Sequence, residues 1–464
     1  MCNVSLNGTQ PTDASIRVLR ALEAAGLEAW YVGGWVRDAL MGRPSHDVDM
    51  CCSGLWQESK AALEAADIAV VESGIKFGGI TAICDGERIE VTTYRLDGFY
   101  TDGRHPQSVE RAASLEDDLA RRDFTVNAMA WHPERGLVDR YDGQGDLDRK
   151  LIRAVGDPKR RFNEDALRML RAVRFACRLD FMIEPATKQA LAECAPLLDA
   201  VARERVGIEL EGILSTGHGG DAMLRYPELV CAAVPELAPA RGFYQCSVYH
   251  AFNVYEHIAR VLTVAGELAL CDGVAPSSSL MWAAFLHDVS KPECFTVDHA
   301  GSGHFYGHPE LGAKKARVIM DRLALSHDLV RDVCLLIKYH DRPLRPERSC
   351  LLNMMRALSG EGVDTPRLLD ELMDLKRADT LGKAPSCFYY VETIEEMRSL
   401  AHELLAAGEP YMLKMLAING GDLIRAGVQP GPELGQLLNA ALDVVIEDNI
   451  PNDREALLAH LNLG

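Results

Sequence analysis

Two aspartates one residue apart, Asp47 and Asp49, are the most reactive pattern in the sequence. They lie in the run HDVDMCC (46–52), whose alternation of polar and apolar residues predicts a strand. Residues i and i+2 of a strand project from one face, so the carboxylates would lie side by side, with Cα atoms roughly 6–7 Å apart. Carboxylates this close repel unless a cation lies between them, and hard oxygen ligands suit Mg²⁺ with substrate phosphates. The pair therefore predicts a site for two Mg²⁺ ions, which can activate an attacking hydroxyl and stabilise a leaving pyrophosphate.

The residues before and after this pair indicate what the metal would meet. Gly33-Gly34 follows a predicted strand (28–32) and opens a predicted helix (35–42), so its backbone N–H groups could cradle a triphosphate. Arg37, one turn on, could grip the phosphates. The alternative interpretation is a plain glycine turn with a surface arginine. Glu90, in a predicted strand at 88–95, is either a third acid facing the pair or an outward strand residue.

The elements around these residues predict a small α/β domain at the front of the chain. A helix (14–26), further strands (46–52 and 79–84), a polar loop (96–114) and an apolar stretch (124–132) complete it. From about residue 160 the pattern is helical to the end, with Pro- and Gly-rich breaks. The prediction is a multidomain α+β chain with four parts: 1–150, 151–220, 221–345 and 346–464.

Composition sets the class of protein. A chain of 464 residues suggests about three domains, at ~150 residues each. It has no run of 18 apolar residues, no signal-like start and no CxxC among its 13 cysteines, which together predict a cytoplasmic protein with reduced thiols and no membrane contact. The net charge of −19 argues against coating nucleic acid by bulk electrostatics. The stretch 150–178 is the exception, with nine Lys/Arg against three Asp/Glu, and is either a phosphate contact or a solvated helix face.

A second chemical pattern lies within that basic stretch. Asp165, Arg168, Arg171 and Arg174 are spaced by threes on a predicted helix and would form a slanting stripe. The alternative is a salt-bridged exposed face, since Glu164 and Arg168 form an i,i+4 pair. Cytosine and adenine both present an amino donor beside a ring-nitrogen acceptor. One Asp and one Arg can read that edge and reject uracil and guanine, which present the opposite pattern.

The order and spacing of several segments resemble the class II tRNA nucleotidyltransferases, the CCA-adding enzymes, which share a head with bacterial poly(A) polymerases. The segments are GGWVRD (33–38), DVD (47–49), VTTYR (91–95), RRDFTVNAMA (121–130) and EDALRMLRAVRFACRLDF (164–181). The resemblance implies a polymerase beta-like nucleotidyltransferase head, an all-α neck, and a helical body and tail. It implies that Asp47 and Asp49 hold the catalytic metals and that Asp165 and Arg168 are the amino-acid template. The residues implied to contact the nucleotide are Gly33, Gly34, Arg37, Arg122, Asn127, Arg171 and Arg174.

Three further segments fit that family. DGFYTDGRHPQSVE (97–110) resembles the loop that the terminal-A step needs, and RERVGIEL (203–210) resembles the neck motif. Residues 416–442 resemble the tail expected to hold the tRNA elbow, for which simple helix–turn–helix packing is the alternative. Asp180 stands where the family usually has Gly, which should alter a helix end.

Histidines further along predict a second metal site. His257, the dipeptide His287-Asp288 and Asp341 lie in a pattern that resembles the HD phosphohydrolases, and HFYGH (304–308) resembles histidines added in several of them. The resemblance implies an HD-type body with a divalent metal. Its substrates, if it is active, would be 2′,3′-cyclic phosphates or phosphomonoesters at RNA ends.

The sequence thus predicts an enzyme that adds C, C and A to the tRNA 3′ end from CTP and ATP without a template. No protein partner is expected. The alternatives are A-only addition, poly(A) synthesis, or an HD phosphohydrolase whose head only binds RNA. The intact DVD and RRDFTVNA segments disfavour the last of these and also a non-catalytic relic.

Overall fold

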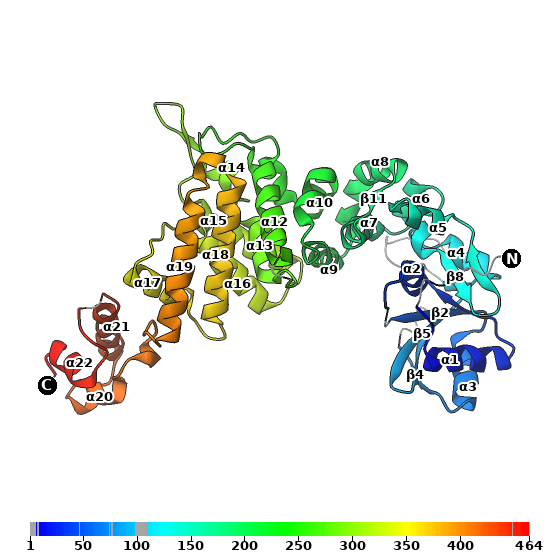
Figure 1. Ribbon diagram of the computed structural model, residues 1–464, viewed down its shortest axis with the longest axis horizontal. Helices are drawn as coiled ribbons and strands as arrows, with labels where there is room; N and C mark the ends of the chain where they lie inside the picture. Colours follow the sequence, from blue (N-terminus) through cyan, green and yellow to red (C-terminus); the bar gives the residue numbers. More distant parts are fainter. Residues whose placement is uncertain are drawn as a thin grey trace. The chain divides into compact units, whose positions relative to one another are not determined.

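The computed structural model describes residues 6, 9–45, 47–73, 75, 78–97, 109–271, 273–447 and 449–463 (Figure 1). The chain divides into two compact units. The first comprises Met1–Leu210 and Glu228–Ala233, and the second comprises Glu211–Pro227 and Val234–Gly464. The finer division into four parts remains a prediction.

A seven-stranded mixed sheet forms the centre of the first unit. In spatial order the strands are β3 (Ala69–Val71), β4 (Gly79–Cys84), β5 (Glu87–Thr93), β2 (Val48–Cys52), β1 (Ala29–Val32), β8 (Met129–His132) and β9 (Gly136–Asp139). Only β2 and β5 pair in parallel within this sheet; its other neighbours are antiparallel. The strands predicted at 28–32, 79–84 and 88–95 and the helix predicted at 35–42 are confirmed to within two residues.

The alternation along β2 decides which side chains reach solvent. Val48 and Met50 point into the larger core, which they share with α1 (Asp13–Ala24) and α3 (Trp56–Ala65). Cys51 points to the opposite face, into a smaller core with α4 (Leu115–Ala120). Since successive residues of a strand alternate, Asp49 lies on the α4 face.

One strand predicted for this unit starts late, and one predicted loop is wrong. The strand predicted at 46–52 is confirmed as β2 but begins at Val48, where its ladder with β5 starts, so Asp47 precedes the strand. The stretch 96–114, predicted as a loop, includes a two-stranded ribbon of β6 (Arg95–Asp97) and β7 (Val109–Arg111). The centre of the loop assigned to the terminal-A step, residues 98–108, lies outside the described residues.

Helices continue the first unit beyond the sheet. They are α2 (Gly34–Leu40), α5 (Gly143–Asp148), α6 (Pro158–Glu164), α7 (Leu167–Leu179), α8 (Pro185–Cys194) and α9 (Arg203–Leu214, with its last four residues in the second unit). A short parallel ribbon of β10 (Leu151–Ile152) and β11 (Met182–Ile183) and 3-10 turns at Thr125–Asn127 and Ala195–Ala200 complete this part. The single helix predicted from residue 164 is broken at Asp165, whose φ of −146° is extended. Asp180 ends α7 in a left-handed conformation, with φ 57°, which glycine adopts more easily.

The second unit is almost entirely helical. Its bundle consists of α12 (Val254–Cys271), α13 (Ser278–Leu286), α15 (His308–Arg322), α16 (His327–Tyr339), α17 (Arg348–Leu358), α18 (Thr365–Gly382) and α19 (Tyr390–Ala406). Shorter elements are α10 (Gly219–Arg225), α11 (Pro227–Ala233, mostly in the first unit), α14 (Lys291–Cys294) and a hairpin of β12 (Thr296–Val297) and β13 (Gly303–His304), with 3-10 turns at Pro235–Ala240, Pro385–Cys387 and Leu413–Met415.

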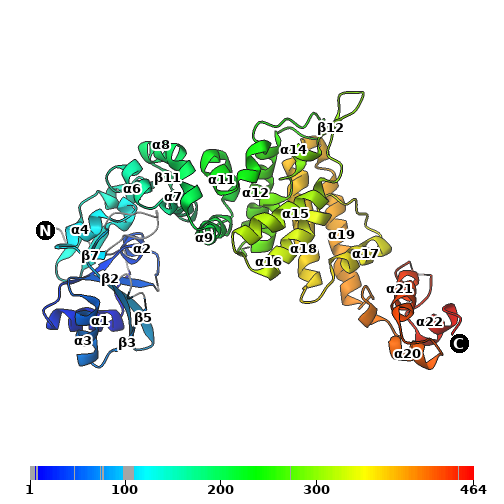
Figure 2. The same ribbon diagram turned by 180° about the vertical axis from the view of Figure 1, so that it is seen from behind.

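The chain ends in a small group of helices with its own core. α20 (Gly420–Arg425), α21 (Pro432–Ile446) and α22 (Arg454–His460) lie together in both views (Figure 1 and Figure 2). Ile418, Leu423, Val445 and Leu457 are buried between them. Among the described residues, none of the helices has the length and apolarity needed to cross a membrane.

Candidate active site

Asp47 and Asp49, which were predicted to lie together, line one cavity, and Glu90 takes the first of its two predicted placements, facing them. Asp49 on β2 and Glu90 on β5 are direct neighbours in the parallel ladder, so their side chains share one face of the sheet. Asp47, just before the strand, lines the same cavity as Asp49 and Glu90. Burial, together with the charges of Glu90 and Asp47, raises the pKa of Asp49 to about 6, against the lowering effect of Arg122 and Arg37. A carboxylate disfavoured in its charged form by burial and by two other acids is a fitting ligand for a divalent cation.

The glycine turn opens directly onto these acids. Gly33 has φ 69°, and a Cβ there would lie 3.0 Å from Arg122 Nη1 and 3.8 Å from Asp49 Oδ2. Gly34 begins α2. The turn therefore needs glycine for its backbone conformation and for the close approach of Arg122.

Arg37 is not a surface arginine, which was the alternative interpretation, since only 3% of the residue is exposed. Its Nη1 donates to Asn127 Oδ1 at 2.7 Å, and its Nε and Nη2 donate to the Asp38 carboxylate at 2.8 and 2.9 Å. Arg37 thus holds Asn127 in place beside the site.

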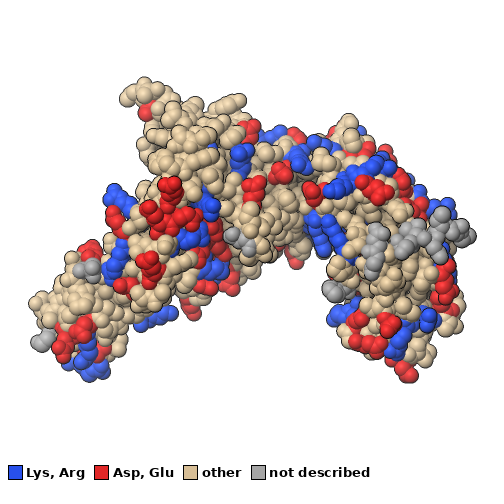
Figure 3. All heavy atoms as spheres, in the orientation of Figure 1, with Lys and Arg blue, Asp and Glu red and all other residues tan. Residues whose placement is uncertain are grey.

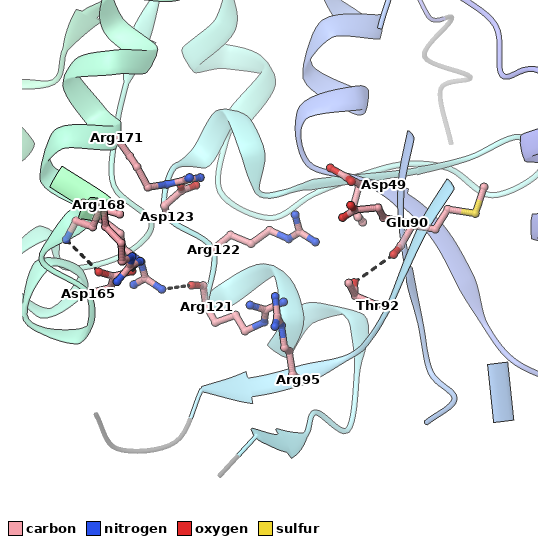
Figure 4. Close-up of a pocket in the computed structure, with 14 residues that line it drawn as sticks. Asp49, Glu90, Thr92, Arg95, Arg121, Arg122, Asp123, Asp165, Arg168 and Arg171 are labelled. Carbon is pink, nitrogen blue, oxygen red and sulfur yellow. Dashed lines mark hydrogen bonds and ion pairs between the residues drawn. The ribbon is translucent and has the colours of Figure 1, made fainter. Parts of the chain in front are cut away.

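Arg122 lies between the acids and the helical part of the unit (Figure 4). Its Nη2 donates to Asp118 Oδ2 at 3.1 Å, and Arg121 contacts the other oxygen of Asp118 at 2.7 Å. Burial would raise the pKa of Asp118, but Arg122 and Arg121 outweigh it and hold that pKa below its ordinary value. The spacing of Asp118 and Arg122, an i,i+4 pair, is the signal that could have identified Asp118 in the sequence.

Asp123 connects this segment to α7. Its Oδ2 accepts hydrogen bonds from Arg171 at 2.7 and 2.9 Å, and its Oδ1 accepts from Asn127 Nδ2 at 3.3 Å. Burial would raise the pKa of Asp123, but Arg171 outweighs it and lowers that pKa. Arg174, one turn further along α7, donates to Glu209 of α9 at 2.6 Å.

The pair predicted to read a base lies across the pocket from the acids. One cavity of about 360 Å³ is lined at one end by Asp49 and Glu90 and at the other by Asp165 and Arg168 (Figure 4). Asp165 is in the break between α6 and α7, not on the helix as predicted. Its carboxylate accepts from the Leu167 N–H at 3.0 Å and from Arg205 at 3.1 Å.

The basic stretch 150–178 is mostly ion-paired. Arg160, Arg161 and Arg168 all contact Glu164, which confirms the predicted i,i+4 pair at 2.8 Å. Lys159 contacts Glu193. On the face shown in Figure 3, basic and acidic side chains are interspersed. Most of the basic side chains in this stretch are therefore paired with acidic side chains of the same chain.

A second group of metal-binding side chains lies inside the helical bundle of the second unit. His257 on α12 and His287 at the end of α13 contact Asp288 Oδ2 at 3.3 and 3.2 Å. The Nε2 atoms of His308 and His340 lie 3.4 and 3.7 Å from the other carboxylate oxygen, Asp288 Oδ1. Each trio, with Asp288 shared, is fully buried and close enough to hold one ion.

Asp341, which was predicted to join this group, belongs to neither buried trio, although it lines a cavity with His308, His340 and Asp379. Asp341 follows α16 with an exposed side chain, whereas its neighbour His340 faces Asp288. The further acid is Asp379 on α18, whose Oδ1 lies 3.1 Å from His257 Nε2. A lone Asp in a helix carries no spacing signal, so Asp379 could be found only from the packing of α18 against α12. Of the HFYGH histidines, His308 joins the group, while His304 stacks on Tyr306 and pairs with Asp298.

Comparison with known proteins agrees with this organisation. The Poly A polymerase head domain model matches residues 29–153, the RNA and SrmB binding site of polymerase A matches 180–240, the HD domain matches 254–383, and tRNA nucleotidyltransferase domain 2 matches 399–461.

Relatives and solved structures match over nearly the whole length. The CCA-adding enzyme of Leuconostoc mesenteroides is 31% identical over 95% of this chain and 93% of its own. That of Lacticaseibacillus paracasei is 32% identical over 98% and 97%. The crystal structure of the Bacillus stearothermophilus CCA-adding enzyme in complex with CTP superposes with a TM-score of 0.73 at 26% identity, covering 98% of both chains. The chain belongs to the family of CCA-adding enzymes.

Proposed function

We propose that the first unit adds C, C and A to the 3′ end of tRNA, using CTP and ATP and releasing pyrophosphate without a nucleic-acid template. The observation that carries this proposal is the single cavity with acids at one end and the Asp165–Arg168 pair at the other (Figure 4). A nucleotide that spans it would present its phosphates to the acids and its base to the pair.

Asp47 and Asp49, with Glu90 beside them, are the residues we expect to hold two Mg²⁺ ions. Bound there, the ions supply the charge that activates the 3′-hydroxyl and stabilises the leaving pyrophosphate. The chain itself contributes position and electrostatics. The guanidinium of Arg122 faces the same cavity, anchored by Asp118, and would meet the phosphates. Gly33, through its missing side chain, leaves room for that guanidinium.

The remaining contacts of the nucleotide follow from the same arrangement. Arg171 lines the cavity while bound to Asp123, and Arg174 lies one turn further on. Gly34 opens α2 at the turn, and Arg37 holds Asn127 in place. Asp165 accepts from the amino group of C or A, and Arg168 donates to the adjacent ring nitrogen.

The test is product length on a tRNA transcript that lacks CCA. CTP alone should add two residues, ATP alone should add none, and CTP with ATP should add three. Extension by ATP alone into a long tail would indicate poly(A) synthesis. Addition of a single A only to transcripts that already end in CC would indicate A-only activity.

A second candidate activity is hydrolysis of phosphoesters in the helical bundle. The observation that favours it is the buried group of His257, His287, Asp288 and Asp379, with His308 and His340 on the second oxygen of Asp288. Histidine and carboxylate ligands together suit a transition metal. Bound there, such an ion would supply an activated water for attack on phosphorus.

The substrates to try are 2′,3′-cyclic phosphates and phosphomonoesters, each with Mn²⁺, Co²⁺ or Ni²⁺ added. Metal-dependent release of phosphate that His287→Asn abolishes would support a catalytic centre. Metal binding without hydrolysis of any of these substrates would indicate that the metal has a structural role.

We further propose that the protein works in the cytoplasm. All twelve cysteines within the described residues are free thiols, as expected where glutathione keeps thiols reduced.

A further inference from the structure

A cavity of about 290 Å³ reaches the buried histidines and acids of the second unit. Its lining includes His340 and Asp379 of that group together with two cations, Lys291 and Lys383. The Nζ atom of Lys291 lies 2.7 Å from Asp288 Oδ2, and that of Lys383 lies 2.6 Å from Asp379 Oδ2. A phosphate that entered the cavity would therefore meet two ammonium groups beside the candidate metal ligands.

Exposed tyrosines lie beside this cavity on three segments of the chain. The tyrosine patch, as we name it, consists of residues between 62% and 77% exposed: Tyr244, Tyr249, Tyr306 and Tyr389. Tyr306 lines the cavity itself, and Tyr249 directly precedes His250, which also lines it. Single exposed aromatic residues are ordinary, but several in one place mark a binding surface.

Backbone hydrogen bonds join the segments that carry the tyrosine patch. The Gly303 N–H donates to the Cys246 carbonyl at 2.8 Å. The Ala384 N–H donates to the Tyr249 carbonyl at 2.9 Å. Figure 2 shows α14, which contains Lys291, and β12 at the same end of the bundle. The patch and the cavity therefore belong to one surface.

Tyr306 is held in place although most of it is exposed. The ring of His304 stacks on it, with centroids 5.3 Å apart and the ring planes 9° apart. The Nε2 atom of His304 in turn lies 3.0 Å from Asp298 Oδ2. A tyrosine supported on one face in this way offers a rigid stacking surface at a low cost in conformational entropy.

We propose that the cavity and the tyrosine patch together bind the end of a single-stranded nucleic acid: the terminal phosphate meets Lys291 and Lys383, and the last base stacks on Tyr306. The proposal rests on the phosphoester hydrolysis proposed for this bundle, and it names the substrate of that site as an oligonucleotide end. Every base has a flat π face, so stacking on tyrosine recognises unpaired bases without selecting a sequence.

The experiment measures binding of two probes by fluorescence anisotropy, with a chelator present. Both are tetranucleotides labelled at the 5′ end and ending in a 3′-phosphate, and the second has a tetrahydrofuran spacer in place of its last base. Tyr306→Ala should weaken binding of the complete probe about tenfold, within the range for one stacked base. It should bind the spacer probe as the wild type does, because the stacking partner is already missing.

Two variants control for the ring and for exposure. Tyr306→Phe keeps the ring and should bind the complete probe as the wild type does. Val318→Ala is the matched surface change, since Val318 is 63% exposed on α15 and does not line the cavity. It should leave the affinity for both probes unchanged.

Either of two results would overturn the proposal. Unchanged affinity of Tyr306→Ala for the complete probe would exclude Tyr306 from the site, and equal losses for the two probes would show that it does not stack on the last base. The chelator keeps hydrolysis out of the measurement. The expected binding without metal-dependent release of phosphate would therefore reject the hydrolytic function and leave the nucleic-acid site standing.

Discussion

At the scale of single residues, the electrostatics of Asp49 connect the fold to catalysis. Its carboxylate is disfavoured by burial and by two acids, and Arg122 and Arg37 offset this in part. A residue kept in such surroundings reduces the stability of the empty protein, and a bound cation would reverse the effect. The cost in stability is thus measurable apart from activity.

Asp49→Asn should raise the melting temperature in the presence of a chelator, increasingly so at higher pH. The folded-state pKa of about 6 lies above the ordinary value of 3.8, so the protonated form is favoured by folding. That stability is fully present below about pH 4 and is lost as pH rises through about 6. The difference between variant and wild type should therefore grow from about pH 4 to about pH 7.

Asp148→Asn, at an exposed position closing α5, is the control and should show a constant difference. Saturating Mg²⁺ at neutral pH should stabilise the wild type and leave Asp49→Asn unaffected. The same variant should incorporate no nucleotide. A pH-independent difference would contradict the assigned environment of Asp49.

Arg168→Ala should relax the choice of base more than it weakens triphosphate binding, because Arg168 faces the base end of the cavity. We expect the UTP-to-CTP ratio of kcat/KM to rise about ten- to hundredfold, the range expected for a lost charged hydrogen bond. Arg160→Ala is the control, since Arg160 shares the partner Glu164 but has a side chain 77% exposed. Equal selectivity in the two variants would argue against a templating role.

At the scale of elements, turns and helix ends place these residues. The turn between β1 and α2 combines a left-handed glycine with the approach of Arg122, and the break between α6 and α7 turns Asp165 toward α9. Each can be tested by a change that alters the backbone or the packing but leaves the reactive groups in place.

Gly33→Ala should lower nucleotide incorporation by displacing Arg122, beyond any loss of stability. Its φ of 69° disfavours alanine by about 1–2 kcal/mol. Gly136→Ala, in the hairpin between β8 and β9, has φ 76° and open space around the added Cβ, so it carries the strain without the crowding. Both variants should melt earlier, and only Gly33→Ala should raise the KM for CTP. Equal KM values would show that the Arg122 contact is unimportant.

Asp180→Gly should stabilise the protein, because this residue ends α7 in a left-handed conformation. Removing the Cβ should add roughly 0.5–1 kcal/mol to the free energy of unfolding, with kcat unchanged. Asp180→Ala should have the opposite sign, since alanine lacks the polar side chain that makes this conformation tolerable. Urea unfolding of both variants decides the matter; stabilisation by Ala would contradict the explanation.

At the scale of the whole molecule, the two groups of candidate metal ligands lie in separate compact units, so their functions should separate. His287→Asn should remove divalent-ion binding in the helical bundle, together with any hydrolysis of phosphoesters there, and leave CCA addition within about twofold of wild type. Asp49→Asn should do the reverse. Incorporation assays and metal titrations on both variants check this, and a loss of CCA addition in His287→Asn would indicate that the units are coupled.

The sequence by itself determined the features that depend on neighbours along the chain. The DVD pair, the Gly33-Gly34 turn, the alternation of β2 and the i,i+4 contact of Glu164 with Arg168 all follow from local periodicity. The resemblance extended this to the base-reading pair and the helical body. The chemistry of the head could therefore be stated before any coordinates, as could its substrates.

Only the tertiary structure decided the partners that come from distant elements. The register of β2 with β5 turned Glu90 toward Asp49, and the packing of α9 brought Arg205 to Asp165. Asp379 took the place expected for Asp341 because α18 packs beside α12, whereas the end of α16 turns His340 inward and leaves Asp341 exposed. Periodicity states which face a residue occupies within its own element, but the packing between elements determines what that face meets.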